Sequence, residues 1–245
     1  MRRFLCFAIV LAAVAVPATF AAPAVSGYAL IYDGPGAAEG GAQAIAAVVE
    51  GMGYRAEYIV DLSTLPAKLA GAAFFAVGGT EDDLGPILSG FTPAVWDALV
   101  RWIKAGGRYL GICGGAYIAS RGWEDEGGFA DALGLLPLET WAHIEEADPV
   151  IVTVTWGGAA RTIYYQYGPC FEPDEGFSPE VLARYDDGTI AALSAKSGAG
   201  RIVLCGPHPE ADETWLDDDP EPKRAGTWKP TDDLAVALLA ALLKP

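Results

Sequence analysis

The sequence predicts an α/β protein with one doubly wound domain, a mostly parallel sheet and a short antiparallel extension. Three observations support this prediction. Short apolar segments rich in β-formers alternate with segments whose apolar residues recur at helical spacing, which is the pattern of βα units. Later in the chain, apolar and polar residues alternate, as in antiparallel strands with one solvated face. At 245 residues and 52% hydrophobic composition, the chain can bury one large core.

The first half of the chain is predicted to alternate strands and helices. Residues 28–32 form an apolar run that ends in a glycine- and proline-rich turn, as a strand does. Apolar residues within 45–52 recur at helical spacing, and a helix-ending glycine follows them. Thr92 and Pro93 supply the cap and the first-turn proline of a second helix. Further strands are expected at residues 54–60, 72–77 and 108–112.

After Ser120 the pattern changes to that of antiparallel strands. Residues 201–204 return to the fully apolar type and are expected to join the parallel strands. A last helix is expected from Thr231, with acidic residues in its first turn and Lys244 in its last. Residues 212–233 are acidic and contain proline, so we expect a solvated surface loop there. The antiparallel strands are expected at residues 150–156, 162–167, 181–185 and 190–193.

Residues 1–24 have the pattern of an export signal. Arg2 and Arg3 precede an apolar run from residue 4 to residue 16, and small residues follow it. The run is shorter than the roughly 20 residues that a membrane-spanning helix needs, and an uncleaved membrane anchor is the alternative. We therefore expect cleavage near residues 21–24 and an exported protein, periplasmic or extracellular, whose single domain covers residues 25–245.

Charge and cysteine content exclude several classes of function. The formal net charge of -16 repels phosphate backbones, so we expect no nucleic-acid partner. Of the four cysteines, Cys6 lies in the export signal, and the three that remain cannot all pair. In an oxidising compartment, one disulfide and one free thiol is the natural solution. No CxxC pair is present and there are two histidines, so we expect no metal site and no cofactor.

A candidate nucleophile lies in the segment 111–115, Gly-Ile-Cys-Gly-Gly, where an apolar strand meets a helix-prone segment. A tight strand-to-helix turn strains its central residue and leaves no room for side chains beside it, so it needs flanking glycines. Such a turn would place Cys113 at the carboxyl edge of the sheet and aim the Gly114 N–H outward as one arm of an oxyanion hole. The loop that contains Gly79 could supply the second arm. The alternative is that Cys113 is a small buried residue in a glycine-rich turn.

A candidate base and its orienting acid follow the apolar strand at residues 201–204. His208 and Glu210 come just beyond the carboxyl end of that strand. A cysteine nucleophile needs a base, and the base needs a group that orients it. The sequence therefore predicts a triad of Cys113, His208 and Glu210, whereas the alternative for His208 is a loop histidine that caps a nearby group. The other histidine, His143, lies outside any such setting and is expected at the surface or in an interface.

These residues resemble the class I glutamine amidotransferase-like superfamily, with its Cys-His-Glu triad on a flavodoxin-like sheet. Within it, the closest resemblance is to the N-terminal domain of the large biotin-protein ligases. The resemblance implies that Cys113 is the nucleophile, His208 the base and Glu210 the orienting acid, with Gly79 and Gly114 as oxyanion donors. It rests on the stretches I-Y-D-G-P-G at 31–36, G-R-Y-L-G-I-C-G-G-A-Y at 107–117, Y-Y-Q-Y-G-P at 164–169 and H-P-E at 208–210.

Two departures from the family pattern limit what the resemblance implies. Glutamine amidotransferases usually carry a glutamine four residues after the nucleophile, and here that position is Tyr117, so free glutamine is not the expected substrate. No ATP-binding or biotin-binding core is visible in the sequence, so ligase activity is not implied. The resemblance also brings Cys170 toward the sheet edge near Cys205, which predicts a disulfide between these two and leaves Cys113 free.

The sequence leaves two main functions open. In the first, Cys113 attacks an amide or ester carbonyl and His208 shuttles the proton, so the protein is a cysteine-dependent hydrolase of a small-molecule or peptide amide. In the second, it is a non-catalytic binding or sensing domain that retains the triad. A redox role of the thiol is the minor third reading. Tyr117, Tyr165 and Tyr167 are expected to line the substrate pocket, with core packing as the alternative for the aromatic cluster. The substrate and the oligomeric state stay undetermined by the sequence.

Overall fold

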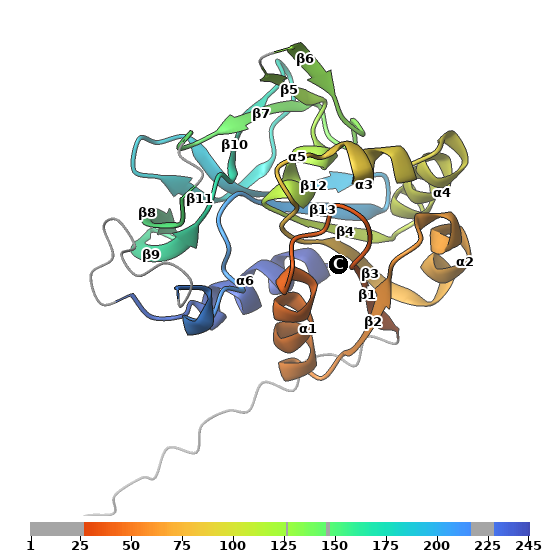
Figure 1. Cartoon of the computed structure of the whole chain (residues 1–245), viewed down its shortest axis with the longest axis horizontal. Coiled ribbons are helices and arrows are strands. Elements are labelled where there is room, and N and C mark those ends of the chain that lie inside the picture. The colour runs from red at the N-terminus through yellow and green to blue at the C-terminus, as the bar shows by residue number, and fades with distance from the viewer. Residues whose placement is uncertain (1–26, 126, 146–147, 217–227) are drawn as a thin grey trace, which may run out of the picture.

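The computed structural model describes residues 27–125, 127–145, 148–216 and 228–245 (Figure 1). The predicted export signal lies outside the described residues. The predicted fold class is confirmed, because a mixed sheet with parallel central strands carries helices on both faces and continues into antiparallel strands.

The sheet has 11 strands in the order β2-β1-β3-β4-β13-β12-β11-β8-β9, with β10 paired to β12 and β7 paired to β10. Neighbours from β2 to β13 are parallel, and all other pairs in this sheet are antiparallel. A separate hairpin pairs β5 with β6. The strands are β1 Tyr28–Tyr32, β2 Arg55–Ile59, β3 Ala72–Val77, β4 Arg108–Ile112, β5 Gly122–Asp125, β6 Gly128–Asp131, β7 Leu138–Ala142, β8 Val150–Trp156, β9 Ala159–Tyr165, β10 Pro169–Pro173, β11 Glu180–Tyr185, β12 Ile190–Ser197 and β13 Gly200–Cys205.

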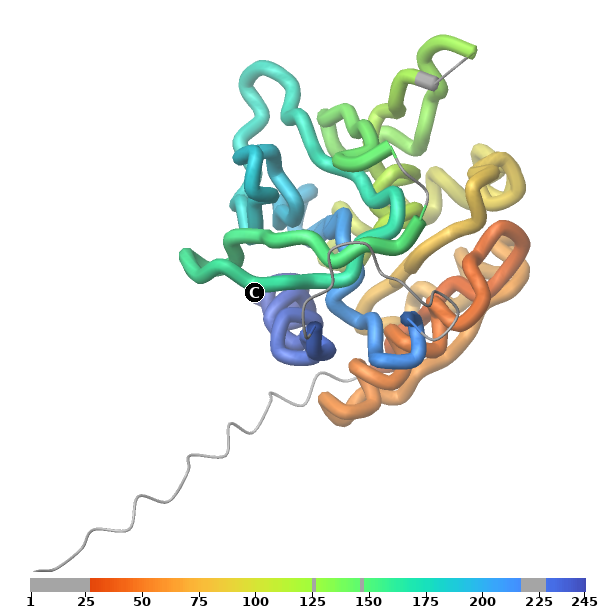
Figure 2. The backbone as a smooth tube through the Cα atoms, turned by 60° about the vertical axis from the view of Figure 1, so that its left-hand side comes forward, coloured from red at the N-terminus to blue at the C-terminus, as the bar shows by residue number. Residues whose placement is uncertain are grey.

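Helices cover both faces of the parallel strands. α1 (Gly41–Gly51) and α6 (Asp232–Leu243) pack on one face and contact each other, although they lie near opposite ends of the described chain (Figures 1 and 2). The other face is covered by α3, α4 and α5. No helix in the described part of the chain is long and apolar enough to cross a membrane. The other bounds are α2 Leu65–Lys68, α3 Gly85–Gly90, α4 Pro93–Lys104 and α5 Gly114–Ala119, with 3₁₀ turns η1 Leu62–Thr64, η2 Leu69–Gly71 and η3 Glu213–Leu216.

The central strands are buried on both faces because apolar residues occupy successive positions. In β3, Phe74 and Ala76 pack with α1 and α6, whereas Phe75 and Val77 pack with α4 and α5. All four are at most 1% exposed. Burial of a large apolar side chain contributes about 1.5–3 kcal/mol, so this strand anchors both layers. The loops after β1, β3, β4 and β13 leave the same edge of the sheet, because these strands are parallel.

Several elements were not predicted from the sequence. β10 pairs with β7 over five residues and with β12 at Phe171. It begins and ends with proline, which donates no backbone hydrogen bond, so its sequence does not have the composition typical of a strand. β5 and β6 each begin with glycine, and the short helical turns between residues 62 and 71 are too brief to show a helical period.

Candidate active site

Cys113 occupies the turn between β4 and α5. Its backbone angles are φ 50° and ψ -112°, and it is one of two described non-glycine residues with positive φ. This conformation is costly for a residue with a side chain and persists only where the surrounding structure holds it. Cys113 is partly exposed, and it is the strained central residue that the sequence predicts for this turn.

The glycines around Cys113 are required by close backbone approach. A Cβ added to Gly115 would overlap the carbonyl oxygen of Val77 in β3, and one added to Gly111 would overlap the Gly115 carbonyl. At Gly114 the added atom would collide with the Thr80 side chain. The Gly115 N–H also donates to Gly78 O at 2.9 Å, which ties the turn to the loop after β3. Glycine is therefore used here for space as well as for its backbone freedom.

His208 is held by backbone and side-chain hydrogen bonds just after β13. Its N–H donates to Tyr164 O at 2.9 Å, and its Nδ1 donates to Glu210 Oε1, also at 2.9 Å. Both side chains are buried, and His208 and Glu210 are each 4% exposed. The second carboxyl oxygen, Glu210 Oε2, is buried without a hydrogen-bond partner among the described residues. Such a buried, half-paired carboxylate is costly to the fold and is the kind of feature found at functional sites.

The structure brings His208 into hydrogen-bonding contact with the Cys113 side chain. Burial by itself lowers the pKa of His208, but the negative charges of Cys113 and Glu210 and the hydrogen bonds to both outweigh it and raise the pKa to about 10. The imidazole is therefore protonated at neutral pH and lies between a carboxylate and a sulfur.

The raised pKa of His208 predicts a pH-dependent contribution to stability. In the unfolded chain the imidazole titrates near its ordinary 6.5, so the protonated pair stabilises the fold fully below that pH. The contribution declines as the pH rises from there through about 10. The free energies of unfolding of the wild type and H208Q, measured in urea, are expected to differ most near about pH 6 and least above about pH 10. A difference that grows with pH would contradict this assignment.

The predicted oxyanion donors have free N–H groups. Neither the Gly79 N–H nor the Gly114 N–H donates a hydrogen bond to another of the described residues. Gly79 lies beside the imidazole, since a Cβ at this position would be 3.2 Å from His208 Cε1. Gly114 directly follows the cysteine. Both N–H groups are thus available to a carbonyl oxygen bound near the sulfur.

Cys113 and His208 line a cleft of about 1530 Å³. Of the three tyrosines predicted for the pocket, Tyr117 and Tyr167 line it, and the Tyr117 hydroxyl donates to Tyr167 O at 3.2 Å. Tyr165 does not. Its ring is fully buried. Its hydroxyl accepts from the Ile144 N–H, and its single proton is shared between Gly168 O at 2.9 Å and Ile144 O at 3.0 Å. Side chains alternate between the two faces of β9, so Tyr164 lines the cleft and Tyr165 packs in the core.

Gln166 is a residue of the site that sequence reasoning missed. Its carbonyl oxygen accepts a hydrogen bond from the Cys113 thiol at 3.5 Å, and its Oε1 accepts from the Tyr164 hydroxyl at 3.1 Å. It lies in the stretch Y-Y-Q-Y-G-P that carried part of the family resemblance. That stretch signalled that the segment matters, but not which of its atoms would contact the sulfur.

The start of the acidic segment 212–233, predicted to be a solvated surface loop, is exposed at residues 212–214 and partly buried at Trp215 and Leu216. Residues 213–216 form η3, and Trp215 packs its ring 5.2 Å from that of Tyr164 and 5.1 Å from that of His208. The apolar surface beside the imidazole attracts this tryptophan despite its acidic neighbours. Residues 217–227 lie outside the described part of the chain.

The predicted disulfide between Cys170 and Cys205 is not formed, and these two residues and Cys113 are free thiols. The Cys170 thiol donates to Trp141 O at 3.4 Å, and the Cys205 thiol donates to Pro207 O at 3.2 Å. Each sulfur is thus directed at a backbone carbonyl of a different segment. Burial raises the pKa of Cys170 to about 12 and the pKa of Cys205 well above its ordinary value, so both are inert thiols.

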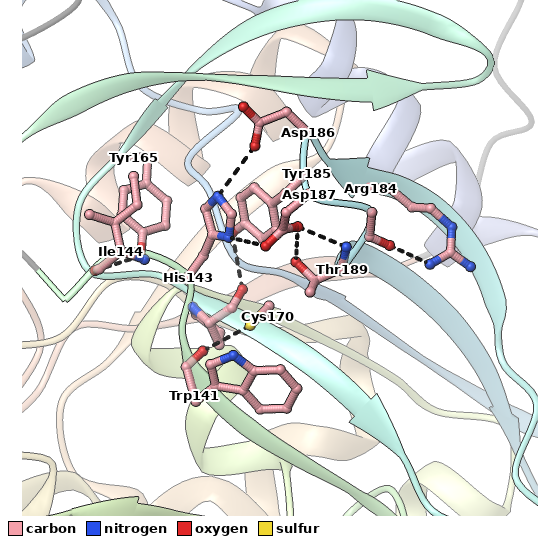
Figure 3. Close-up of polar contacts among 12 residues, drawn as sticks. Trp141, His143, Ile144, Tyr165, Cys170, Arg184, Tyr185, Asp186, Asp187 and Thr189 are labelled. Atoms are coloured by element: carbon pink, nitrogen blue, oxygen red, sulfur yellow. Dashed lines mark hydrogen bonds and ion pairs between the residues drawn. The ribbon is translucent and has the colours of Figure 1, made fainter.

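His143, which was expected at the surface or in an interface, is partly buried within the chain itself. Its side chain is 9% exposed and stacks on the Tyr185 ring, with ring centroids 3.7 Å apart (Figure 3). Its ring nitrogens lie 3.5 Å from Asp187 and 4.0 Å from Asp186. Burial lowers the pKa of His143 more strongly than these two carboxylates raise it. The aromatic stacking and the burial come from strands that are distant in the sequence, which is why no local pattern revealed them.

Within the described residues, no group of three or more His, Cys, Asp or Glu side chains is arranged to hold a metal ion.

Comparison with known proteins identifies the fold. A solved glutamine amidotransferase superposes on 88% of this chain and 99% of its own, with a TM-score of 0.60 and 17% identity. A glutamine amidotransferase from Thermotoga maritima covers 89% of this chain with a TM-score of 0.57 and 11% identity, over 97% of its own. A putative ThuA-like protein from Bacteroides uniformis covers 93% and 94% of the two chains, with a TM-score of 0.54 and 16% identity. At these identities the likeness concerns the fold, which is that of class I glutamine amidotransferase-like proteins.

A sequence comparison adds one partial match. No family model matches the chain. Cobyric acid synthase from Halorhodospira halophila (strain DSM 244 / SL1) is 32% identical over 132 residues, which are 51% of this chain. The match spans 27% of that protein's length, about a quarter of the curated relative. The comparisons therefore show that the chain has the fold of class I glutamine amidotransferase-like proteins.

Proposed function

We propose that this protein is a cysteine-dependent amide or ester hydrolase in which Cys113 is the nucleophile, His208 the general acid and base, and Glu210 the group that orients the imidazole. The observation that carries the proposal is the contact between the strained Cys113 and a buried His208 whose pKa is raised to about 10. A histidine in a purely structural role does not need a strained thiol as its neighbour. The substrate would be a small-molecule or peptide amide.

In the first half of the reaction, the Cys113 sulfur attacks the substrate carbonyl carbon. The carbonyl electron pair moves to oxygen, which the N–H groups of Gly79 and Gly114 stabilise, at about 10²- to 10³-fold in rate for each donor. When the intermediate collapses, the carbon–nitrogen bond breaks and the protonated His208 gives its proton to the leaving amine. A thioester on Cys113 and a free amine result. The high pKa of His208 suits this step, because the imidazole still carries the proton when the amine needs it.

In the second half, water hydrolyses the thioester. Acylation removes the negative charge at Cys113, one of the causes that raise the pKa of His208, so the pKa falls and the imidazole becomes a base. His208 then takes a proton from water, which attacks the thioester carbonyl. Collapse of this second intermediate releases the carboxylic acid and returns the sulfur to the enzyme. Glu210 keeps the ring in place throughout by its bond to Nδ1 at 2.9 Å.

The openness of the site favours this function over a non-catalytic domain that retains the triad. Cys113 and His208 both line the cleft, so the sulfur and the imidazole face the space that a substrate would occupy. A binding domain would not require N–H groups left without partners near the sulfur, as at Gly79 and Gly114.

Two finer points belong to the same proposal. The four stretches quoted above support a relationship to the N-terminal domain of the large biotin-protein ligases. The N-terminal pattern of residues 1–24 supports export with cleavage near residues 21–24. N-terminal sequencing of the protein recovered from the periplasm or medium would test export, and an intact Met1 on membrane-bound material would contradict it.

Acylation of Cys113 tests the proposed function directly. p-Nitrophenyl acetate is expected to give a burst of p-nitrophenolate, with the acetyl group found on Cys113 by mass spectrometry of the intact protein and its peptides. E210Q is expected to slow the burst by roughly 10²-fold or more while its melting temperature shows that it is folded, because the amide no longer fixes a charged imidazole. C113A should give no burst, and C170A is the matched control that keeps it. Acetylation at an equal rate in C113A would contradict the proposal.

A further inference from the structure

The described cleft is acidic, and the protonated His208 is the one cationic side chain among its described lining residues. Seven carboxylate side chains line it, from segments that are distant in the sequence, whereas no described lining residue is Lys or Arg. Glu81, Asp82 and Asp83 lie on the loop after β3, the same loop that holds Gly79. Glu39 lies on the loop after β1, which leaves the sheet at the same edge as the loop after β3. These charges therefore gather at the sheet edge that carries the nucleophile.

The opposite wall adds further carboxylates. Glu124 comes from β5, and Glu145 and Asp148 come from the segment between β7 and β8. Within the described residues, no ion pair is formed by Glu39, Glu81, Asp82, Glu124 or Glu145. Seven carboxylates are not balanced by one imidazolium, so they repel one another, and low-dielectric walls focus their field on whatever enters. A positively charged ligand would relieve this repulsion.

Aromatic side chains are placed in the same walls. Trp141 and Tyr167 line the cleft with 40% and 46% of their surface exposed, and Trp123 also lines it. Exposed aromatic faces attract ammonium and guanidinium groups through the ring quadrupole and accept the apolar stems that carry them. This observation is independent of the carboxylates and favours the same chemical class of ligand.

We infer that the substrate is an amide bearing an ammonium or guanidinium group, which the carboxylates of the cleft attract while its acyl carbon reaches Cys113. The inference rests on the proposed function, because it concerns the specificity of that nucleophile. Two independent features of the cleft point to this ligand. The strained thiol and the unpaired N–H groups near it favour an acyl group as the reacting part of the ligand. The carboxylates and aromatic rings of the cleft walls favour a cationic group beside it. The carboxylates of the cleft would repel an anionic substrate, such as an amide that also bears a carboxylate group.

Charged thiol reagents test the inference on the whole protein without knowledge of the natural substrate. Trimethylammonioethyl methanethiosulfonate and sulfonatoethyl methanethiosulfonate differ in charge but react alike, since the thiolate attacks the reagent sulfur and methanesulfinate leaves. For Cys113, the rate constant with the cationic reagent is divided by the rate constant with the anionic reagent. This ratio is then divided by the ratio measured for 2-mercaptoethanol, which corrects for the intrinsic reactivity of the two reagents. We expect a normalised ratio of about 10 or more, which falls as NaCl is added.

Matched variants separate the cleft from the overall charge. E81Q/D82N/E145Q removes three carboxylates from the cleft, and E50Q/D97N/E175Q removes the same residue types from exposed positions that do not line it. The first is expected to lower the normalised ratio several-fold, and the second to leave it nearly unchanged. A wild-type ratio near or below one, or an equal loss in both variants, would overturn the inference. Because the reagents report on Cys113 whether or not it hydrolyses an amide, failure of the acylation experiment would count against the proposed function alone.

Discussion

Iodoacetamide is expected to alkylate Cys113 in the native protein about 100-fold faster than Cys170 or Cys205. Cys113 is partly exposed in the cleft, beside His208, the base that the proposed function assigns to it. The other two thiols are fully buried, and burial raises the pKa of both. Peptide mapping after timed labelling at neutral pH measures the three rates separately.

The dependence on His208 distinguishes an activated thiol from one that is merely accessible. H208Q should slow alkylation of Cys113 by roughly 10-fold or more at neutral pH, because the glutamine amide cannot take the proton from the sulfur. H143Q is the matched control, since it makes the same substitution at the other histidine, and it should leave the Cys113 rate unchanged. In urea all three cysteines are expected to react alike. Equal, slow labelling of the three in the native state would remove the catalytic assignment.

Gly115→Ala is expected to cost roughly 3 kcal/mol or more in the free energy of unfolding. The added methyl would overlap the Val77 carbonyl oxygen in β3, the fully buried strand that anchors both layers of helices. Neither backbone can move freely, because the Gly115 N–H is bonded to Gly78 O at 2.9 Å in the adjacent loop. Urea denaturation measures the loss, and slower alkylation of Cys113 should accompany it, because the strained turn must shift.

Gly51→Ala is the matched control for this substitution. Gly51 is also a helix residue, the last one of α1. A Cβ added there would meet nothing within 4 Å, and the position is exposed. Alanine at such a site is expected to be neutral or to stabilise by a few tenths of a kcal/mol, because glycine has the greater freedom in the unfolded chain. Equal stability of the two variants would show that the close approach at Gly115 is relieved at little cost.

Much of the local architecture could be predicted from the sequence. β3 and β4 have apolar residues at nearly every position, and α4 has a proline at its first position and a clear helical period. Such signals depend on neighbours within one turn or one strand, so they survive any tertiary arrangement. β10 was missed because it begins and ends with proline, which is untypical of a strand. It forms through pairing with β7, a strand about thirty residues earlier.

Some features of the candidate site could likewise be predicted from the sequence, whereas others depend on the tertiary structure. The glycines around Cys113 and the position of His208 after an apolar strand were visible in the sequence, because a tight turn and a strand end are local features. Tyr165 could not be separated from Tyr164 by composition, since the face of β9 decides which of the two lines the cleft. The burial of His143 against Tyr185 was equally hidden, because it joins two segments forty residues apart.

By itself, the sequence determined the class of fold, the strained turn and the types of residue available for the chemistry, because each depends on short-range periodicity and on the space that glycine leaves. The tertiary structure alone decided that Cys113 meets His208, that Cys170 and Cys205 stay apart as buried thiols, and that carboxylates from four segments share one cleft. Those outcomes depend on which distant segments the sheet order makes neighbours, and no local pattern encodes the distance between them.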